Sequence, residues 1–271
     1  MPSTQSVVPL SNDSQNSLQQ LNETGTVCSN PVLSVIIPLY NGITFIETAI
    51  RSVIDQRCNV DLIVVDGGST DGSWQVVQNY RSWITHSITE PDKGIYDAMN
   101  KGIDQARGEW LYFLGADDAL QPGVLTKILP YLTSDKVMVY GDVCFDTGWQ
   151  FSSTLNRRIL FQNTVHHQGA FYHRTLFNTF RYDTSLRILS DYELNLKIYQ
   201  YQLPTRKVPL IIACCREGGA SSGIKLSITE ANLVRAKYLS SRILNNAVSV
   251  MLKLYYAQKQ LRALLFRSRR Y

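Results

Sequence analysis

Four short polar segments of the chain carry the residues whose types and spacing could do chemistry. They read Pro-Leu-Tyr-Asn at 38–41, Asp-Gly-Gly-Ser at 66–69, Asp-Lys-Gly-Ile-Tyr-Asp at 92–97 and Gly-Ala-Asp-Asp at 115–118. The last segment places two adjacent carboxylates directly after an apolar run, Trp-Leu-Tyr-Phe-Leu. Carboxylate oxygens are the ligands that Mg²⁺ and Mn²⁺ prefer in proteins. Asp117 and Asp118 are therefore candidates for half of a metal site.

Each segment, taken alone, also fits a plain structural role. Asp is favoured in turns and at helix N-caps, because its carboxylate accepts hydrogen bonds from nearby backbone N–H groups. Asp66 could turn its own loop, and Asp92 and Asp118 could each cap a helix that follows. Only if the four segments met at one place would they form a site.

Alternating strands and helices would bring the four segments together. An element change about every 25–30 residues predicts βαβ units, and therefore a parallel sheet with helices on both faces. Such sheets bind ligands at the carboxyl ends of their strands, which is where the polar segments fall. The predicted strands lie near 33–37 (stopped by Pro38), 60–66, 86–90, 109–114 and 136–143, and the predicted helices near 42–56, 72–83, 94–107 (ended by Gly108) and 122–132.

Beyond residue 145 the alternation weakens. Residues 189–201 predict a helix with Ser190 as its cap and Asp191 in its first turn, and residues 205–215 predict a strand. His166 and His167 lie in an aromatic segment, but their spacing alone does not form a metal site. The five cysteines are scattered without a CxxC pair, which favours free thiols over a structural zinc site.

Charge divides the chain of 271 residues unevenly. The first 224 residues carry 17 Lys and Arg against 21 Asp and Glu, whereas the last 47 carry 10 against 1. Residues 1–30 are rich in Ser, Asn, Gln and Thr and predict a disordered leader without the features of a signal peptide. No apolar run reaches the roughly 18 residues that a membrane span needs.

The basic C-terminal segment has apolar residues at three-to-four spacing from Ser227 onward. A basic amphipathic helix is typical of a membrane-surface element, so we expect peripheral attachment to the inner face of the cytoplasmic membrane of a cytoplasmic protein. A helix packed on the domain with a solvated basic face, or a contact between subunits, would produce the same pattern. Nucleic acid is a weaker candidate, since no stacking or groove-reading motif accompanies the charge.

The four segments in this order, with Asp-Lys-Gly-Ile-Tyr-Asp-Ala-Met-Asn-Lys-Gly at 92–102, resemble the family 2 nucleotide-sugar glycosyltransferases. The 92–102 segment looks most like the branch that builds bacterial surface polysaccharides. The resemblance runs from about residue 33 to about residue 200. It implies the GT-A fold, a Rossmann-like, mostly parallel α/β sheet flanked by helices, here with a C-terminal helical extension.

The resemblance implies a division of the chain into parts. A disordered leader (1–30) would precede a GT-A catalytic domain (31–225), and a basic amphipathic helical tail (226–271) would follow it. The catalytic domain would comprise a nucleotide-sugar half (31–145) and an acceptor half (146–225).

The resemblance also assigns roles at the paired carboxylates. Asp118 would bind one Mn²⁺ or Mg²⁺, which would neutralise the charge that develops on the nucleoside diphosphate leaving group. Asp117 would contact the ribose or a water on the metal. Ala116 stands where the first Asp of a strict D-x-D motif would be, so the match is to the variant with two adjacent carboxylates.

Other donor contacts are implied by the remaining segments. Asp66 would accept a hydrogen bond from a uracil-type base, while Pro38 and Tyr40 would line the base pocket. Lys93 would reach a phosphate or the base edge, and Asp92 would bind the donor unless it only caps a helix. Asp97 and Asn100 share one side of the following helix, and we expect them to face the donor as well.

Inversion at the anomeric carbon needs a base that takes the proton of the acceptor hydroxyl. The resemblance assigns this role to Asp191, with Ser190 where Glu often stands and Glu193 as the competing carboxylate. Asp191 could instead only stabilise the helix dipole. His167 is implied as a contact to the acceptor or the diphosphate.

The function expected from these residues is that of a metal-dependent inverting hexosyl- or N-acetylhexosaminyltransferase. It would move a sugar from a nucleotide-sugar donor, a UDP-sugar in the first instance, to a hydroxyl of a glycan or lipid-linked acceptor. One alternative is a nucleotidyltransferase, which should carry a Gly-rich loop with Lys or Arg directly after its first strand. Residues 40–45 read Tyr-Asn-Gly-Ile-Thr-Phe there. The other alternative is an inactive nucleotide-sugar-binding scaffold, which should lack a carboxylate.

Overall fold

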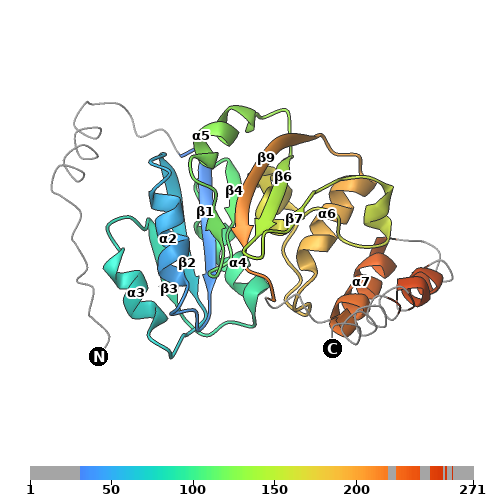
Figure 1. Ribbon diagram of the computed structural model, residues 1–271, viewed down its shortest axis with the longest axis horizontal. Helices are drawn as coiled ribbons and strands as arrows, with labels where there is room; N and C mark the ends of the chain where they lie inside the picture. The colour runs from blue at the N-terminus through green and yellow to red at the C-terminus, as the bar shows by residue number, and fades with distance from the viewer. Residues whose placement is uncertain (1–30, 219–223, 239–244, 253, 255–257, 259–271) are drawn as a thin grey trace, which may run out of the picture. The chain divides into compact units, whose positions relative to one another are not determined.

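The computed structural model describes residues 31–218, 224–238, 245–252, 254 and 258. In these residues a nine-stranded sheet has the order β3-β2-β1-β4-β8-β6-β9-β5, with β7 paired to β6 (Figure 1). The strands are β1 (Leu33–Leu39), β2 (Val60–Asp66), β3 (His86–Thr89), β4 (Trp110–Phe113), β5 (Ala119–Leu120), β6 (Met138–Phe145), β7 (Gln150–Phe151), β8 (Ala170–His173) and β9 (Thr205–Cys215).

The first four strands of the sheet form its parallel half. β1 pairs in parallel with β2 and β4, and β2 pairs in parallel with β3. β8 then runs antiparallel between β4 and β6, and β9 runs parallel to β6. Both predicted halves of the domain, 31–145 and 146–225, therefore contribute strands to the same sheet. The α/β fold class predicted from the sequence is confirmed, with β8 inserted antiparallel and the two-residue strands β5 and β7 also antiparallel to their partners.

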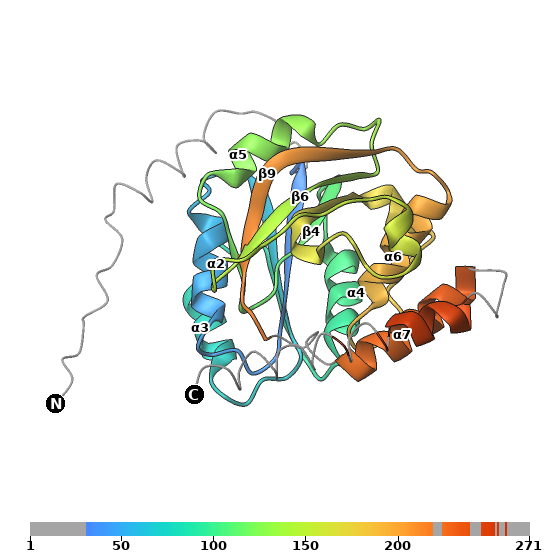
Figure 2. The same cartoon turned by 45° about the vertical axis from the view of Figure 1, so that its right-hand side comes forward.

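Helices cover both faces of the sheet (Figures 1 and 2). In β1, Val35 and Ile37 pack with helices α2, α3 and α5, and Ile36 packs on the opposite face with α4 and α6. Because both faces are buried, the strand is a continuous apolar run without alternation. The helices are α2 (Ile46–Ile54), α3 (Ser73–Asn79), α4 (Ile95–Gln105), α5 (Val124–Ile128), α6 (Ser190–Gln200) and α7 (Ile224–Tyr238).

Pro38 does not end the first strand as predicted, because β1 continues to Leu39. The carbonyl of Ile36 accepts a hydrogen bond from Leu114 on the β4 side, and the carbonyl of Leu39 accepts one from Gly67 on the β2 side. By this alternation, residue 38 faces the β4 side, where the β1–β4 pairing has already stopped at Ile36. The missing N–H of proline therefore costs the strand no ladder bond.

Gly108 also has a different role from the one predicted. α4 ends at Gln105, and Gly108 lies in the loop that enters β4. A Cβ atom on Gly108 would lie 2.5 Å from the backbone nitrogen of Ser34 and 2.7 Å from the carbonyl carbon of Leu33. Glycine is needed there because the loop passes directly over the start of β1.

The C-terminal helix α7 packs against α6 and against short 3₁₀ turns. Residues 245–252 are helical as well. Half of the predicted basic tail, including the cluster at 259–270, lies outside the described residues, as does the predicted leader. Among the described residues, no helix combines the length and apolarity that crossing a membrane requires. The short 3₁₀ helices are Leu129–Tyr131, Arg157–Leu160, His167–Gly169 and Arg174–Asn178.

Candidate active site

The four polar segments lie at one edge of the sheet, where β1, β2, β3 and β4 end. Hydrogen bonds join neighbouring segments: Gly67 N–H donates to the Leu39 carbonyl at 2.8 Å, and Thr70 N–H donates to the Asn41 side chain at 2.9 Å. The N–H of Glu90 donates to the Asp66 carbonyl at 3.0 Å. The parallel topology thus brings together residues that are up to about 80 positions apart in the sequence.

Asp66 is fully buried at the end of β2. Its carboxylate accepts hydrogen bonds from the N–H and hydroxyl of Ser69 and from the Thr89 hydroxyl, the last at 2.6 Å. Asp66 therefore does stabilise its own loop, which is the structural role that the sequence left open. These contacts fix the orientation of the carboxylate at the edge of the sheet.

Asp92 lies directly beside this loop. A Cβ atom on Gly67 would lie 2.3 Å from an oxygen of Asp92, so only glycine leaves room for the carboxylate. Asp92 accepts a hydrogen bond from the Gly94 N–H at 2.8 Å, just before α4 begins. Burial, and further the nearby Asp97 and Asp66, raise the pKa of Asp92 despite Gly94 and Lys101. The residue thus faces the site and also holds the helix start.

The other predicted donor contacts differ in exposure. Pro38 is buried within β1, whereas the Tyr40 side chain is 66% exposed just beyond its end. Lys93 is exposed in the loop before α4, where its N–H donates to Asp97. Asn100 does not face this edge as expected, because its amide bonds to both backbone groups of Tyr182 at 2.9 and 3.0 Å.

Asp118 is buried after β4, and its neighbour Asp117 is exposed. One oxygen of Asp118 accepts from the Arg216 backbone N–H at 3.0 Å, and the other accepts from the Gln168 side chain at 2.7 Å. Burial, followed by the charge of Asp117, raises the pKa of Asp118 to about 6. A Cβ atom on Gly115 would lie 2.3 Å from Asp118 and 3.1 Å from Asp117, so both carboxylates fold back over this glycine.

The paired carboxylates fit a divalent cation. Mg²⁺ and Mn²⁺ bound with nucleotides take one or two carboxylates from the protein and the remaining oxygens from phosphates and water. Burial and the charge of Asp117 disfavour the ionised form of Asp118, and a cation bound there would favour it. Within the described ranges, no group of three or more His, Cys, Asp or Glu residues is arranged to hold a metal by itself. Asp118 and Asp117 would therefore supply only part of the ion's coordination, and phosphate and water oxygens would supply the rest.

Two residues around Asp118 were not singled out from the sequence. Gln168 holds the carboxylate, and its own carbonyl accepts from the Tyr112 hydroxyl at 2.8 Å. Arg216 follows the last residue of β9, and its guanidinium lies 4.0 Å from the centre of the Phe45 ring. The only sequence signals were the position of Gln168 next to the histidine pair and a cation directly after a strand.

Asp191 lies in the first turn of α6 and is buried. It accepts hydrogen bonds from the Tyr96 hydroxyl at 3.0 Å and from the Asn163 side chain at 2.8 Å. Burial raises the pKa of Asp191 to about 6, and the bonds to Tyr96, Tyr192 and Asn163 oppose that increase. A carboxylate with this pKa is ionised near neutral pH and still accepts a proton readily.

The predicted neighbours of Asp191 act differently. Ser190 does not cap α6: Leu189 is the N-cap residue, and the Ser190 hydroxyl accepts from the Asp183 N–H at 2.7 Å. Glu193, the competing carboxylate, bonds to Lys237 of α7 at 2.9 Å. Glu193 therefore forms an ion pair that links α6 to α7. Asp191 is for this reason the better candidate for the base.

His167 lies beside Asp191, with 4.0 Å between its Nδ1 and a carboxylate oxygen. Its buried ring packs against Phe113 at a centroid distance of 5.2 Å. Burial lowers the pKa of His167 to about 3, so the ring is neutral. Neither ring nitrogen has a hydrogen-bond partner among the described residues. The burial of His166, between Phe145 and Phe151, lowers its pKa to about 4.

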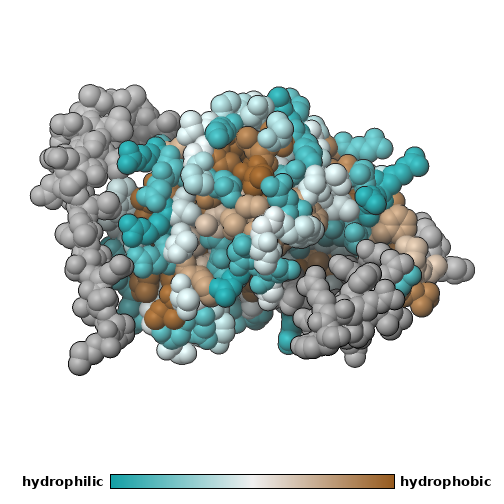
Figure 3. Space-filling view, in the orientation of Figure 1, coloured by the Kyte–Doolittle hydropathy of each residue, from teal (hydrophilic) through white to brown (hydrophobic). Residues whose placement is uncertain are grey.

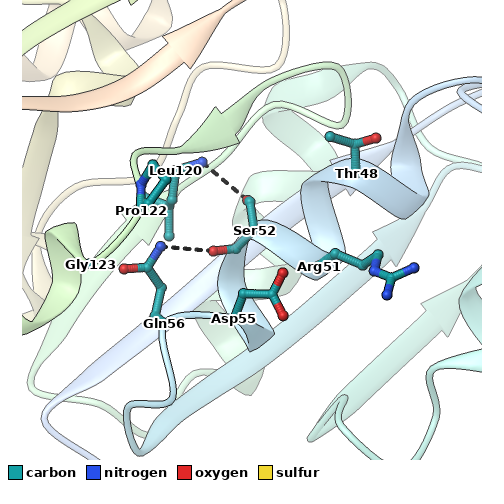
Figure 4. A pocket seen from close by; sticks show the side chains of 8 residues that line it. All are labelled: Thr48, Arg51, Ser52, Asp55, Gln56, Leu120, Pro122 and Gly123. Atoms are coloured by element: carbon teal, nitrogen blue, oxygen red, sulfur yellow. Dashed lines mark hydrogen bonds between the residues drawn. The ribbon is translucent and has the colours of Figure 1, made fainter. Parts of the chain in front are cut away.

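Two pockets lie away from these carboxylates. One, of about 420 Å³, lies between α2 and the segment around β5, where Ser52 bonds to the Leu120 N–H and to the Gln56 side chain (Figure 4). None of the predicted site residues lines it. A smaller pocket, of about 240 Å³, lies between α5 and β9, where Figure 3 shows a hydrophobic area. The carboxylates of the four polar segments instead lie where β1, β2, β3 and β4 end.

Comparison with known proteins identifies a family for the chain. The family described as Glycosyl transferase family 2 matches residues 34–191. A PGL/p-HBAD biosynthesis glycosyltransferase of Mycobacterium tuberculosis is 31% identical over 234 residues, which cover 82% of this chain and 90% of that protein.

Solved structures show the same fold. S. aureus TarS 1–349 in complex with UDP-GlcNAc has a TM-score of 0.62 at 18% identity, covering 81% of this chain and 71% of that one. The mannosyltransferase PcManGT from Pyrobaculum calidifontis, in complex with GDP-Man and Mn²⁺, has a TM-score of 0.59 at 16% identity, covering 94% of this chain and 85% of that one. The sheet and its helices thus have the GT-A fold, and the chain belongs to glycosyltransferase family 2.

Proposed function

We propose that this glycosyltransferase moves a sugar from a UDP-sugar to a hydroxyl of a glycan or lipid-linked acceptor, with inversion and with Mn²⁺ or Mg²⁺. The observation that carries the proposal is the buried Asp118 beside Asp117, at the sheet edge that also holds Asp66 and Asp92. The UDP-GlcNAc and the GDP-Man with Mn²⁺ of the structural relatives support a nucleotide-sugar donor and a divalent ion. Family membership favours glycosyl transfer over the nucleotidyltransferase and scaffold alternatives.

The donor would lie along the edge of the sheet. Asp66 and Asp92, with the backbone around Pro38, would hold the base, and the exposed Tyr40 ring would pack on its flat face. Asp117 would take the ribose, and Lys93 would reach a phosphate. A divalent ion bound by Asp118 would neutralise the diphosphate as it leaves. Gln168 and the Arg216 N–H hold Asp118 in place for that task.

Asp191 would act on the acceptor. Its carboxylate takes the proton of the acceptor hydroxyl, the hydroxyl oxygen bonds to the anomeric carbon, and the bond from that carbon to the diphosphate breaks. Tyr96 and Asn163 hold the carboxylate in one orientation. His167 is neutral, and among the described residues neither ring nitrogen has a hydrogen-bond partner, so its N–H could donate to the acceptor or diphosphate and its other nitrogen could accept.

A thermal-shift and hydrolysis panel tests the donor assignment. UDP-GlcNAc, UDP-glucose, GDP-mannose and a dTDP-sugar would be compared with and without Mn²⁺, in the wild type and in Asp118→Asn. We expect one UDP-sugar to raise the Tm with Mn²⁺, and Asp118→Asn to abolish the part of the increase that requires the ion. Stabilisation by no nucleotide sugar, with Asp118→Asn behaving as wild type, would reject the proposed function.

We also propose that the basic tail holds the protein at the inner face of the cytoplasmic membrane. The support is the presence of six basic residues and no acidic residue over 250–271, together with the apolar positions between them. Deleting residues 250–271 should move the protein out of the membrane fraction and abolish its sedimentation with anionic vesicles. Retention of the shortened chain in the membrane fraction would contradict this placement.

A further inference from the structure

Glu230 of α7 makes an unusual set of contacts just ahead of the candidate base. Its side chain is buried, and one oxygen accepts from the Arg187 N–H at 2.8 Å. The other oxygen accepts from the N–H groups of Ile188 at 2.9 Å and Leu189 at 3.0 Å. These three consecutive N–H groups lead directly into the first turn of α6. A carboxylate from another helix therefore fixes the segment that presents Asp191.

Arg235, one turn further along α7, holds the opposite side of Asp191. It is fully buried and donates to the Phe161 carbonyl at 2.7 Å, two residues before Asn163. Asn163 in turn donates to the Asp191 carboxylate at 2.8 Å. Arg235 is itself held by Asn245 at 3.0 Å and Ser249 at 2.9 Å, in the following helical segment. Both segments that surround Asp191 are thus attached to α7.

From these contacts we infer that Glu230 and Arg235 are positioning residues for Asp191, and that α7 fixes the segments that hold this residue in the catalytic site. The inference rests on the proposed role of Asp191 as base. A buried carboxylate that accepts three backbone hydrogen bonds cannot be removed without leaving those N–H groups unpaired. The segment 187–189 would then move, and Asp191 would move with it.

The contacts also predict which step is affected. The strands and loops that would hold the donor lie in residues 33–118, and no described contact of Glu230 or Arg235 reaches them. Loss of either side chain should therefore change the proton transfer to Asp191 and leave donor binding intact. A general destabilisation of the fold would instead impair proton transfer and donor binding together.

The test compares Glu230→Gln and Glu230→Ala with wild type, Asp191→Asn and a control, Lys237→Met. Lys237 lies on the same helix and pairs with Asp183 and Glu193, but it does not contact segments 187–189 or 161–163. The activity is release of nucleoside diphosphate from the sugar nucleotide that the donor panel identifies. Amide hydrogen exchange at Arg187, Ile188 and Leu189 provides a second measurement that needs no substrate.

We expect kcat to fall about 10-fold in Glu230→Gln and about 100-fold in Glu230→Ala, since small displacements of a catalytic group have effects of this size. KM for the donor should stay within about twofold of wild type, because ground-state binding is unchanged. The acid limb of the pH–rate profile should move below its wild-type position as water reaches Asp191. Lys237→Met should lower the Tm but leave kcat and the acid limb unchanged, and exchange at 187–189 should rise only in the Glu230 variants.

Two results would overturn the inference. Glu230 variants with wild-type kcat, pH profile and exchange at 187–189 would show that the contacts are dispensable. A Lys237→Met variant as impaired as Glu230→Ala would show that any loosening of α7 is sufficient. An active Asp191→Asn would instead reject the base assignment itself, so the two failures are distinguishable. If Glu230→Ala does not fold, Glu230→Gln and the exchange measurement decide the question.

Discussion

At the scale of single residues, the buried carboxylates Asp118 and Asp191 differ in their neighbours. Burial raises the pKa of both to about 6. Asp118 has a second carboxylate beside it and is held by amide donors, which suits a cation. Asp191 is held by a tyrosine hydroxyl and an amide, away from other carboxylates, which suits a base. The difference lies in the neighbours, because the two residues are chemically identical.

Asp191→Asn should lower kcat by about 10²–10⁴-fold, since the general base is removed, while donor binding measured by thermal shift stays at the wild-type level. In the wild type, kcat should rise with pH through about 6, because Asp191 acts only when ionised. A rate that does not depend on pH between 5 and 7 would contradict this role. Steady-state kinetics across that range provide the measurement.

Gln168→Leu should weaken Mn²⁺ binding by about 10–100-fold, as is typical when a residue that orients a metal ligand is lost. The physical reason is that Asp118 loses its 2.7 Å hydrogen bond and gains rotational freedom. The Mn²⁺ concentration that gives half-maximal activity would be compared with that of Gln162→Leu, a nearby exposed glutamine. An unchanged Mn²⁺ requirement in Gln168→Leu would show that Gln168 does not orient the ligand.

At the scale of elements, the ends of the strands and the first turn of α6 position the candidate site residues. β1, β2 and β4 end at the same edge because they are parallel and in register; Asp66 is the last residue of β2, and the loop after β4 carries Asp118. α6 begins with Asp191 in its first turn, where a carboxylate also interacts favourably with the helix dipole.

Gly108→Ala should destabilise the protein by about 1–3 kcal/mol, because the added Cβ atom meets the backbone of Leu33 and Ser34 rather than a mobile side chain. Gly42→Ala is a suitable comparison, since its Cβ atom would meet only the end of Leu39 at 3.0 Å. Urea unfolding of the two variants checks the difference. Equal stability of Gly108→Ala and wild type would show that the loop relaxes without cost.

At the scale of the whole molecule, the site combines residues from very distant parts of the chain. Asp118 is held by Gln168 and by Arg216, and Asp191 is held by Tyr96 and Asn163. A ligand that bridges these carboxylates would stabilise the entire domain. A ligand at 100 times its dissociation constant adds about 2.7 kcal/mol of stability.

The stability of the ligand-free protein should depend on pH through the same two carboxylates. Their folded-state pKa values lie above the ordinary value, so their contribution is fully present below about pH 4 and is lost as the pH rises through about 6. The Tm of the wild type should therefore fall between about pH 4 and about pH 6 relative to the double variant Asp118→Asn, Asp191→Asn. Adding Mn²⁺ with UDP should reduce the Asp118 part of that fall. Parallel Tm profiles of the two proteins would contradict the assignment.

The sequence by itself determined the local features of this protein. Apolar runs predicted β1, β2, β3, β4, β6 and β9 but not the short strands β5, β7 and β8, and the three-to-four spacing predicted the helices. The polar segments after the strands carried the family resemblance and marked the carboxyl ends of the strands as the candidate site. These features depend on neighbouring residues, and so they can be read along the chain. Pro38 and Gly108 were misread, because their roles depend on which strand lies opposite them.

Only the tertiary structure decided which side chains support the carboxylates. Gln168, Arg216 and Asn163 reach Asp118 and Asp191 across 28–98 positions of sequence, and Glu230 reaches the segment before Asp191 from a helix about 40 residues away. The position of β8 between β4 and β6, and the packing of α7 on α6, create these contacts. Burial and pairing depend on three-dimensional neighbours, so no spacing along the chain encodes the two raised pKa values.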